Sequence, residues 1–215
     1  QRNNKTLYAL KINNDPEDTS GAKLLESAAK LASATDNKLI QIMKCDLNIS
    51  NCIIDTIHTN KITDLIVGIH HKANIVDTFL GGTITALING TSHQNLIIYG
   101  PKRPVNSVKR LVVTVPQMAE LEIGFDLWFD RVKNIASQLS IPIVFYANKT
   151  TTEALKKQCE IHSSLNVSFR EVASGEDFLI ISKDIKHSDT LIVITARKAT
   201  MSYNNLFEKI PYYLN

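Results

Sequence analysis

The chain has 215 residues, of which 44% are hydrophobic and 21% are charged, with 24 basic residues against 21 acidic ones. This composition is typical of a soluble globular protein and leaves room for one large or two small domains. The formal net charge of +3 gives no case for nucleic-acid binding. No apolar stretch approaches the roughly 18 residues of a membrane helix, and no signal peptide pattern opens the chain. The three cysteines lack CxxC spacing, which favours buried free thiols in a reducing compartment.

Short apolar runs alternate with segments of helical period along the whole chain. Strands are predicted at residues 7–12, 39–43, 65–67, 96–99, 110–115, 143–146, 167–172 and 191–194. Helices are predicted at residues 20–32, 50–58, 81–88, 119–139, 152–161 and 175–185, with one or two final turns at 205–213. This alternation indicates an α/β fold with mostly parallel sheets and right-handed crossovers.

Two details of this pattern carry further expectations. The runs at 65–67 and 191–194 are short and rich in β-branched residues, which is typical of strands buried on both faces of a parallel sheet. The helix predicted at 119–139 carries Phe125, Trp128 and Phe129, an aromatic stripe that is more typical of a core than of a ligand cage.

The two halves of the chain look like one unit used twice. Leu65-Ile66-Val67 matches Leu191-Ile192-Val193 at an offset of 126, and Tyr8-Ala9 matches Tyr146-Ala147 at an offset of 138. These offsets predict a first repeat at 1–104 and a second at 105–215. On this alignment the first repeat lacks its first strand and helix, and the second lacks its last strand. We therefore expect a piece of a longer protein, or a chain that a partner completes.

Several segments carry a resemblance to a known family. They are GIHHK at 68–72, DTFLGGT at 77–83, NLIIYGPKRPVNSVKRLVVTVP at 95–116, AELEIGFDLW at 119–128 and PIVFYAN at 142–148. With these segments the chain resembles a tandem pair of universal stress protein domains, which have an adenine nucleotide alpha hydrolase-like fold. More narrowly, it resembles the cytoplasmic C-terminal region of bacterial sodium/proton antiporters of the cation:proton antiporter family.

The resemblance extends to a glycine-rich loop. In universal stress protein domains that hold ATP, this loop has a glycine, two further residues, a second glycine, nine further residues, and then a third glycine followed by Ser or Thr. Gly68 and Gly81 keep the first and third glycine positions, His71 replaces the second glycine, and Gly82 precedes the hydroxyl of Thr83. Backbone without side chains lets phosphates approach amide groups at a helix N-terminus. These five residues are the predicted nucleotide-binding residues, with ATP or another adenine nucleotide as the ligand. The alternative is that the glycines only end a strand and open a helix, with no ligand.

The second repeat offers no such loop. Ile194, Arg197 and Asn205 stand where glycines would be needed. ATP-binding members also resemble one another in an acidic residue at the end of their first strand. At that place the second repeat has residues 115–117, Val-Pro-Gln. We therefore expect the second repeat to stay empty.

Other chemistry is not predicted. His70 and His71 are adjacent and have no Cys or acidic residue close by, which makes a poor metal site, and no catalytic motif is present. The sequence therefore predicts no enzyme. As the resemblance implies, we expect a cytosolic regulatory or sensor domain of a sodium/proton antiporter, at the cytoplasmic face of the inner membrane. Its expected partners are the transport domain of the same polypeptide and a second copy in a homodimer. A free-standing tandem universal stress protein that binds ATP or a related nucleotide is the alternative.

Overall fold

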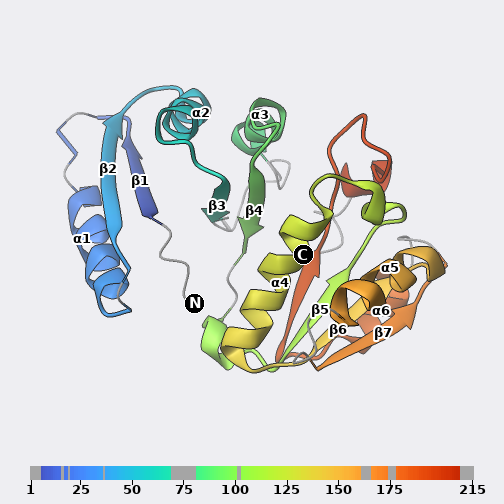
Figure 1. Ribbon diagram of the computed structural model, residues 1–215. Helices are drawn as coiled ribbons and strands as arrows, with labels where there is room; N and C mark the ends of the chain where they lie inside the picture. The colour runs from blue at the N-terminus through green and yellow to red at the C-terminus, as the bar shows by residue number, and fades with distance from the viewer. Residues whose placement is uncertain are drawn as a thin grey trace. The chain divides into compact units, whose positions relative to one another are not determined.

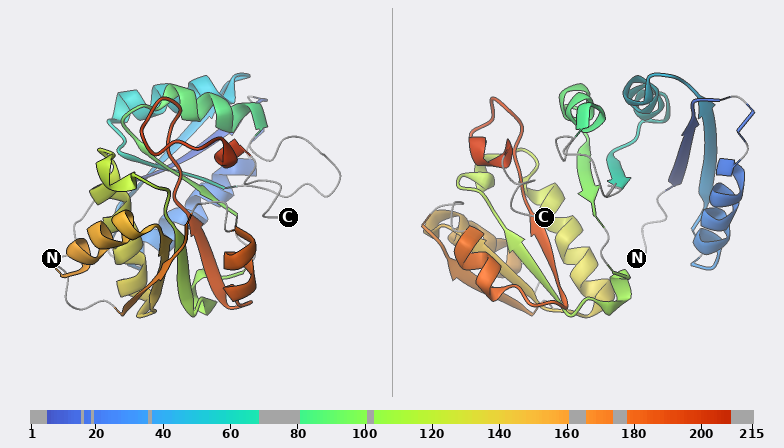
Figure 2. Two further views of the ribbon diagram at one scale, coloured as in Figure 1. Left: turned by 90° about the vertical axis from the view of Figure 1, so that its right-hand side faces the viewer. Right: turned by 180° about the vertical axis from the view of Figure 1, so that it is seen from behind.

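The structure is a computed structural model that describes residues 6–15, 17–18, 20–35, 37–68, 81–100, 103–160, 166–173 and 178–208. The chain divides into two compact units, the first formed by residues 1–64 and 80–94 and the second by residues 65–79 and 95–215. Figure 1 labels their helices and strands, and Figure 2 gives two further views. Among the described residues, no helix combines the length and the apolar character that crossing a membrane requires.

In its described residues, the first unit has one parallel strand pair and three helices. The strands β1 (Leu7–Asn13) and β2 (Leu39–Cys45) run in register from Leu7 opposite Leu39 to Asn13 opposite Cys45. The helices are α1 (Ser20–Ser33), α2 (Ile49–Asn60) and α3 (Gly81–Gly90). Helix α1 makes the crossover between the two strands and packs on them, and α2 packs against α3 (Figure 1).

The described part of the second unit has two sheets. The strand pair β3–β4 is formed by β3 (Asp64–Gly68), which joins this unit from Leu65 on, and β4 (Asn95–Tyr99). The larger sheet has the order β7-β6-β5-β8 and is parallel throughout. Its strands are β5 (Arg110–Thr114), β6 (Ile143–Ala147), β7 (Val167–Glu171) and β8 (Asp189–Val193). Its helices are α4 (Phe125–Leu139), α5 (Lys149–Glu160) and α6 (Phe178–Asp184), with short 3-10 turns η1 (Val105–Ser107), η2 (Ala119–Leu121) and η3 (Asn205–Glu208).

Helices cover both faces of the four-stranded sheet. Because side chains alternate along a strand, Leu111 and Val113 of β5 face one core, whereas Val112 between them faces another. The first core is closed by α4 and α5, through residues such as Phe129 and Leu155. The second core is smaller and is closed by α6 through Ile181. The second unit is thus a three-layer α/β arrangement.

The predicted α/β fold with parallel strands is confirmed, and each of the eight predicted strands has a counterpart. The compact units do not follow the predicted repeats at 1–104 and 105–215, because β3 and β4 group with the second unit. That division into repeats stays a prediction. Helix α6 is described from Phe178 on, and the predicted turns at the C-terminus are described as far as Glu208.

The helix predicted at 119–139 is wrong over its first six residues. A 3-10 turn at Ala119–Leu121 comes first, and α4 begins only at Phe125. Met118 before this turn has a left-handed backbone with φ of 61°, and Glu122 after it is extended with ψ of 139°. Neither conformation continues a helix. The aromatic stripe does lie in the core as predicted, with Phe125 and Phe129 buried and Trp128 half-buried against them.

Two predictions about burial are also wrong. Strand β3 is not buried on both faces, because Ile66 is 67% exposed and the described residues pair β3 only with β4. The three thiols are free, but Cys45 is exposed rather than buried.

Candidate functional site

The residues of the predicted nucleotide loop lie in both compact units. Gly68 is the last residue of β3 and falls in the second unit, whereas Gly81, Gly82 and Thr83 form the first turn of α3 in the first unit. His71 lies outside the described residues. The structure therefore does not test whether these five residues form one site, and the site stays a prediction.

Helix α3, which begins with Gly81 and Gly82, is packed through residues beyond its first turn. Leu87 of α3 is fully buried and Ile84 is nearly so. At the last residue of the helix, a β-carbon on Gly90 would lie 2.4 Å from Cδ1 of Ile54 in α2, so a side chain there would require the end of the Ile54 side chain to move. The first turn, by contrast, is open, because a β-carbon on Gly82 would meet no atom within 4 Å. The backbone at the start of α3 is thus accessible to a ligand.

In the second unit the place for a ligand is the carboxyl edge of the four-stranded sheet. From β5 the chain continues to β6 and β7 on one side and then returns to β8 on the other side of β5. Open α/β sheets bind ligands at such a reversal, outside the carboxyl ends of the strands. Pairing persists to this edge, because the N–H of Ile194 donates to the carbonyl oxygen of Thr114 at 2.9 Å. The loops after β5 and β8 leave the sheet from there.

The loop after β5 is bound to its neighbours by two polar side chains. Gln117 donates from Nε2 to the carbonyl oxygen of Ala173, after β7, at 3.0 Å. The carboxylate of Glu120 accepts a hydrogen bond of 2.7 Å from the hydroxyl of Thr151, a fully buried residue in the first turn of α5. Asn148 caps the same helix by accepting from the N–H of Thr151 at 2.8 Å. These groups hold the edge together and satisfy one another.

Glu122 connects the loops after β5 and β8. Its Oε1 accepts from the N–H of Ser202 at 2.8 Å and from the Ser202 hydroxyl at 2.7 Å. Burial alone would raise the pKa of the Glu122 carboxyl, but the two hydrogen bonds from Ser202, supported by Thr200 and the Met201 amide, outweigh it and hold this pKa below its usual value. Glu122 is therefore ionised at neutral pH.

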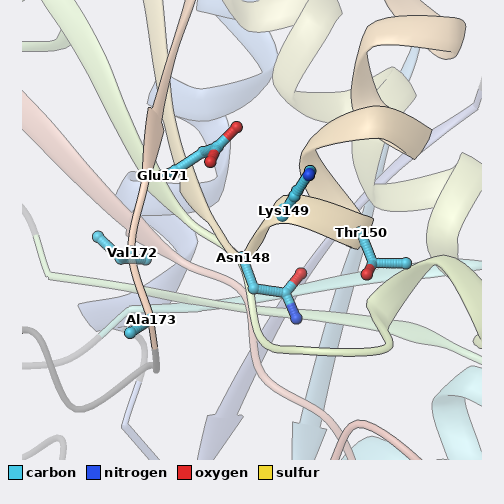
Figure 3. Close-up of a pocket in the computed structure, with 6 residues that line it drawn as sticks. All are labelled: Asn148, Lys149, Thr150, Glu171, Val172 and Ala173. Atoms are coloured by element: carbon cyan, nitrogen blue, oxygen red, sulfur yellow. The ribbon is translucent and has the colours of Figure 1, made fainter.

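A hollow of about 380 Å³ lies at the ends of β6 and β7. It is lined by Asn148, Lys149, Thr150, Glu171, Val172 and Ala173. Figure 3 shows that these residues come from the start of α5 and from the end of β7. The hollow is shallow and polar and is lined by one cationic side chain, Lys149, and one anionic side chain, Glu171. It has no apolar wall that would enclose a ligand.

Metal-binding groups and thiols are the remaining candidates for chemistry among the described residues. They contain no group of three or more His, Cys, Asp or Glu side chains that could hold a metal ion. Burial raises the pKa of the Cys52 and Cys159 thiols, which makes them poorer nucleophiles at neutral pH.

The sequence reasoning missed Glu122 and Ser202. They are 80 positions apart, and no spacing rule joins them. The one signal nearby was Gly124, which interrupts the apolar pattern two residues after Glu122. A helix predicted to start after Gly124 would have left Glu122 in a loop.

Comparisons with known proteins bear on the fold. No protein-family model and no curated protein matches the sequence. A solved structure from Pseudomonas aeruginosa UCBPP-PA14, described as a universal stress protein, matches with a TM-score of 0.62 and 13% identity, over 96% of this chain and 78% of its own. The fold is universal stress protein-like. A functionally unknown protein of Pseudomonas aeruginosa PAO1 matches similarly, with a TM-score of 0.61 and 12% identity, over 97% of this chain and 79% of its own.

Proposed function

We propose that this chain is a non-catalytic regulatory or sensor module that binds an adenine nucleotide and belongs to a membrane cation/proton antiporter. The observation that carries the proposal is the universal stress protein-like fold over nearly the whole chain. The antiporter assignment rests on the segments between residues 68 and 148 that resemble the C-terminal region of that family. The module would lie at the cytoplasmic face of the inner membrane, with the transport domain of the same polypeptide as its partner.

The two carboxylates that bind the edge of the second unit together are poor candidates for a general acid or base. Glu120 and Glu122 are each engaged by hydroxyl groups of neighbouring segments. A general acid or base must reach its substrate with a proton to give or take, and these carboxylates are already bound within the protein.

The alternative is a free-standing tandem universal stress protein, and the fold favours both equally. The coding sequence on either side of this chain distinguishes them. We expect roughly a dozen apolar segments of about 20 residues each to precede it in the same reading frame. A reading frame without such segments would leave the free-standing protein as the function.

For the ligand we propose the start of α3 in the first repeat, where the amides of Gly81, Gly82 and Thr83 would face an anionic group of the nucleotide. The backbone at Gly82 is open, with no atom within 4 Å of the position of a β-carbon. The N-terminus of a helix favours negative charge. His71 would add an imidazolium to the same loop.

The Gly82→Val variant tests this site. A branched side chain over the helix start should abolish binding of ATP, AMP or a cyclic dinucleotide in calorimetry, because it blocks the approach of the anion. The fold should survive, since the added β-carbon meets nothing. Gly100→Val is the matched control, because a β-carbon there also meets no atom, and it should bind like the wild type.

The pH dependence of binding tests His71. If its imidazolium pairs with a phosphate, affinity should fall as the pH rises through about 6 to 7, where an unperturbed histidine loses its proton. Equal affinity in the wild type and in Gly82→Val would rule out the site. If none of the nucleotides binds to the wild type, the glycines only shape the chain.

A further inference from the structure

In the loop after β5, the residues Leu121, Glu122 and Ile123 show the reverse of the burial that their hydrophobicity predicts. Leu121 is 58% exposed and Ile123 is 100% exposed, whereas Glu122 between them is half-buried and turns its carboxylate towards Ser202. Apolar side chains normally go inside and charged ones outside. The transfer of apolar surface therefore opposes this arrangement, and a specific attraction for the carboxylate must hold it.

That attraction comes from a turn in the loop after β8. The N–H of Tyr203 donates to the carbonyl oxygen of Thr200 at 3.3 Å, which closes a turn with Met201 and Ser202 at its centre. Ala199 just before it has a left-handed backbone with φ of 66°. The backbone N–H groups of Met201 and Ser202 both donate to the Glu122 carboxylate. Successive N–H groups in a turn form a concavity that binds anions. Ser202, which is only 4% exposed, adds its hydroxyl to the concavity.

The backbone of Glu122 is held by hydrogen bonds at both its N–H and its carbonyl oxygen, which fixes the position from which the carboxylate reaches the turn. Its N–H donates to the carbonyl oxygen of Ala119 at 3.1 Å, and its own carbonyl oxygen accepts from the N–H of Phe125 at 3.0 Å. The second of these bonds joins Glu122 to the first residue of α4. The late start of α4 is what leaves Glu122 outside the helix and free to reach the turn.

We propose that the turn at residues 200–203 is an oxyanion-binding site that the protein fills with its own Glu122 carboxylate. The site would accept a small oxyanion, such as a carboxylate or inorganic phosphate, once the internal carboxylate is removed. While Glu122 is bound, the loop after β8 is closed to an external anion and tied to the loop after β5. This inference concerns the second unit and does not depend on the proposed nucleotide site at Gly82.

Chemical rescue tests the proposal. Glu122→Ala should bind acetate and phosphate saturably, and chloride at equal ionic strength should have no such effect. Thermal unfolding followed by circular dichroism is the measurement. At an anion concentration of about ten times the dissociation constant, the folded-to-unfolded ratio should rise about elevenfold. The wild type should show no saturable rise, because its own carboxylate fills the site.

Three variants serve as controls. Glu122→Gln keeps the side chain in place and should exclude the anion. Glu120→Ala removes a carboxylate from the same loop that is bound to Thr151 instead, so acetate should not stabilise it. Adding Ser202→Ala to Glu122→Ala removes the hydroxyl donor and should weaken acetate binding about tenfold or more.

Each outcome decides the question. If Glu122→Ala is unfolded in chloride, recovery of its circular dichroism spectrum in acetate supports the proposal, and failure to recover overturns it. Equal effects of acetate on Glu122→Ala and Glu120→Ala would also overturn it, because the stabilisation would then come from general anion effects.

Discussion

Arg110 joins β5 to β8 and α6 at the amino end of the four-stranded sheet. Glu122 joins two loops at the opposite, carboxyl end. As the first residue of β5, it donates from Nε at 3.1 Å and from Nη2 at 2.5 Å to Oδ2 of Asp189, the first residue of β8. Nη2 also donates to the carbonyl oxygen of Asp184, the last residue of α6, at 2.8 Å. The Asp189 side chain is only 2% exposed, so removing Arg110 would leave a buried carboxylate without its cationic partner, bonded only to the N–H of Lys186 among the contacts described here.

Tyr146 extends this cluster, because its hydroxyl donates to Oδ2 of Asp184. Burial, together with the hydrogen bond and the charge of Asp184, raises the pKa of Tyr146 to about 12, although Arg110 and Arg170 act in the other direction. A group whose pKa is raised on folding adds stability that is complete below its unfolded pKa of about 10 and is lost as the pH rises through the folded value. The contact of Tyr146 with Asp184 should therefore weaken between about pH 10 and pH 12.

A tyrosinate titration in the near ultraviolet checks this. Of the six tyrosines in the chain, one should ionise late, near pH 12, while circular dichroism still reports a folded protein. In Tyr146→Phe this late step should disappear, and the free energy of unfolding at neutral pH should fall by about 1–2 kcal/mol, since Asp184 loses a hydrogen-bond donor. Simultaneous ionisation of all tyrosines near pH 10 in the folded protein would contradict the assignment.

At the scale of elements, the packing of α4 on the sheet depends on a row of stacked rings. Phe129 of α4, Phe145 of β6 and Phe169 of β7 follow one another with centroid separations of 6.0 and 5.9 Å, and each pair is inclined by 18°. Phe129 and Phe145 are 2% and 1% exposed. The row crosses the face of the sheet that α4 and α5 cover and fixes the helix against the two strands.

Phe129→Ala measures what this row contributes. Deleting a buried ring leaves a cavity, and we expect the free energy of unfolding to fall by about 3–5 kcal/mol in denaturant titrations followed by circular dichroism. Leu127→Ala, two residues earlier on the same helix and 50% exposed, is the matched control and should change stability by less than about 1 kcal/mol. Similar losses in the two variants would show that the row is not what anchors α4.

Elements with a clear local signal were predictable from the sequence, and their termini were predictable where a turn residue marked them. The β-branched runs located β5, β6 and β8, and glycines marked both ends of α3. The start of α4 was not predictable from periodicity, because Leu121 and Ile123 continue the apolar pattern although both are exposed. The contact of Glu122 with Ser202 depends on which strands are neighbours in the sheet, and local spacing carries no information about that.

At the scale of the whole molecule, the two halves pair their strands differently. In the second half β5 pairs with both β6 and β8. Within the described residues of the first half, β1 pairs only with β2 and β3 only with β4, each in a separate two-stranded sheet. By the repeat alignment, β1 corresponds to β6 and β3 to β8, and the described part of the first half has no counterpart of β5. The division into repeats, with a first repeat that lacks its first strand, stays a prediction.

The unpaired edges lead us to predict association. An exposed strand edge is a template for another chain, and two-fold pairing is the usual result in homo-oligomers. Light scattering at tens of micromolar should therefore give the mass of a dimer, which should dissociate on dilution. A monomer mass throughout the concentration series would contradict pairing through the edges.

The position of Trp128 gives the second compact unit a spectroscopic signature of its own. It is the single tryptophan of the chain and lies in α4, with the rings of Phe125 at 5.3 Å and Phe129 at 6.2 Å in edge-to-face contact. Its emission therefore reports the packing of the second unit alone, whereas the amide signal averages over both units. If the first unit unfolds at lower temperature, the amide transition begins while the indole emission is still native. The gap between the two curves then measures how independently the two units fold.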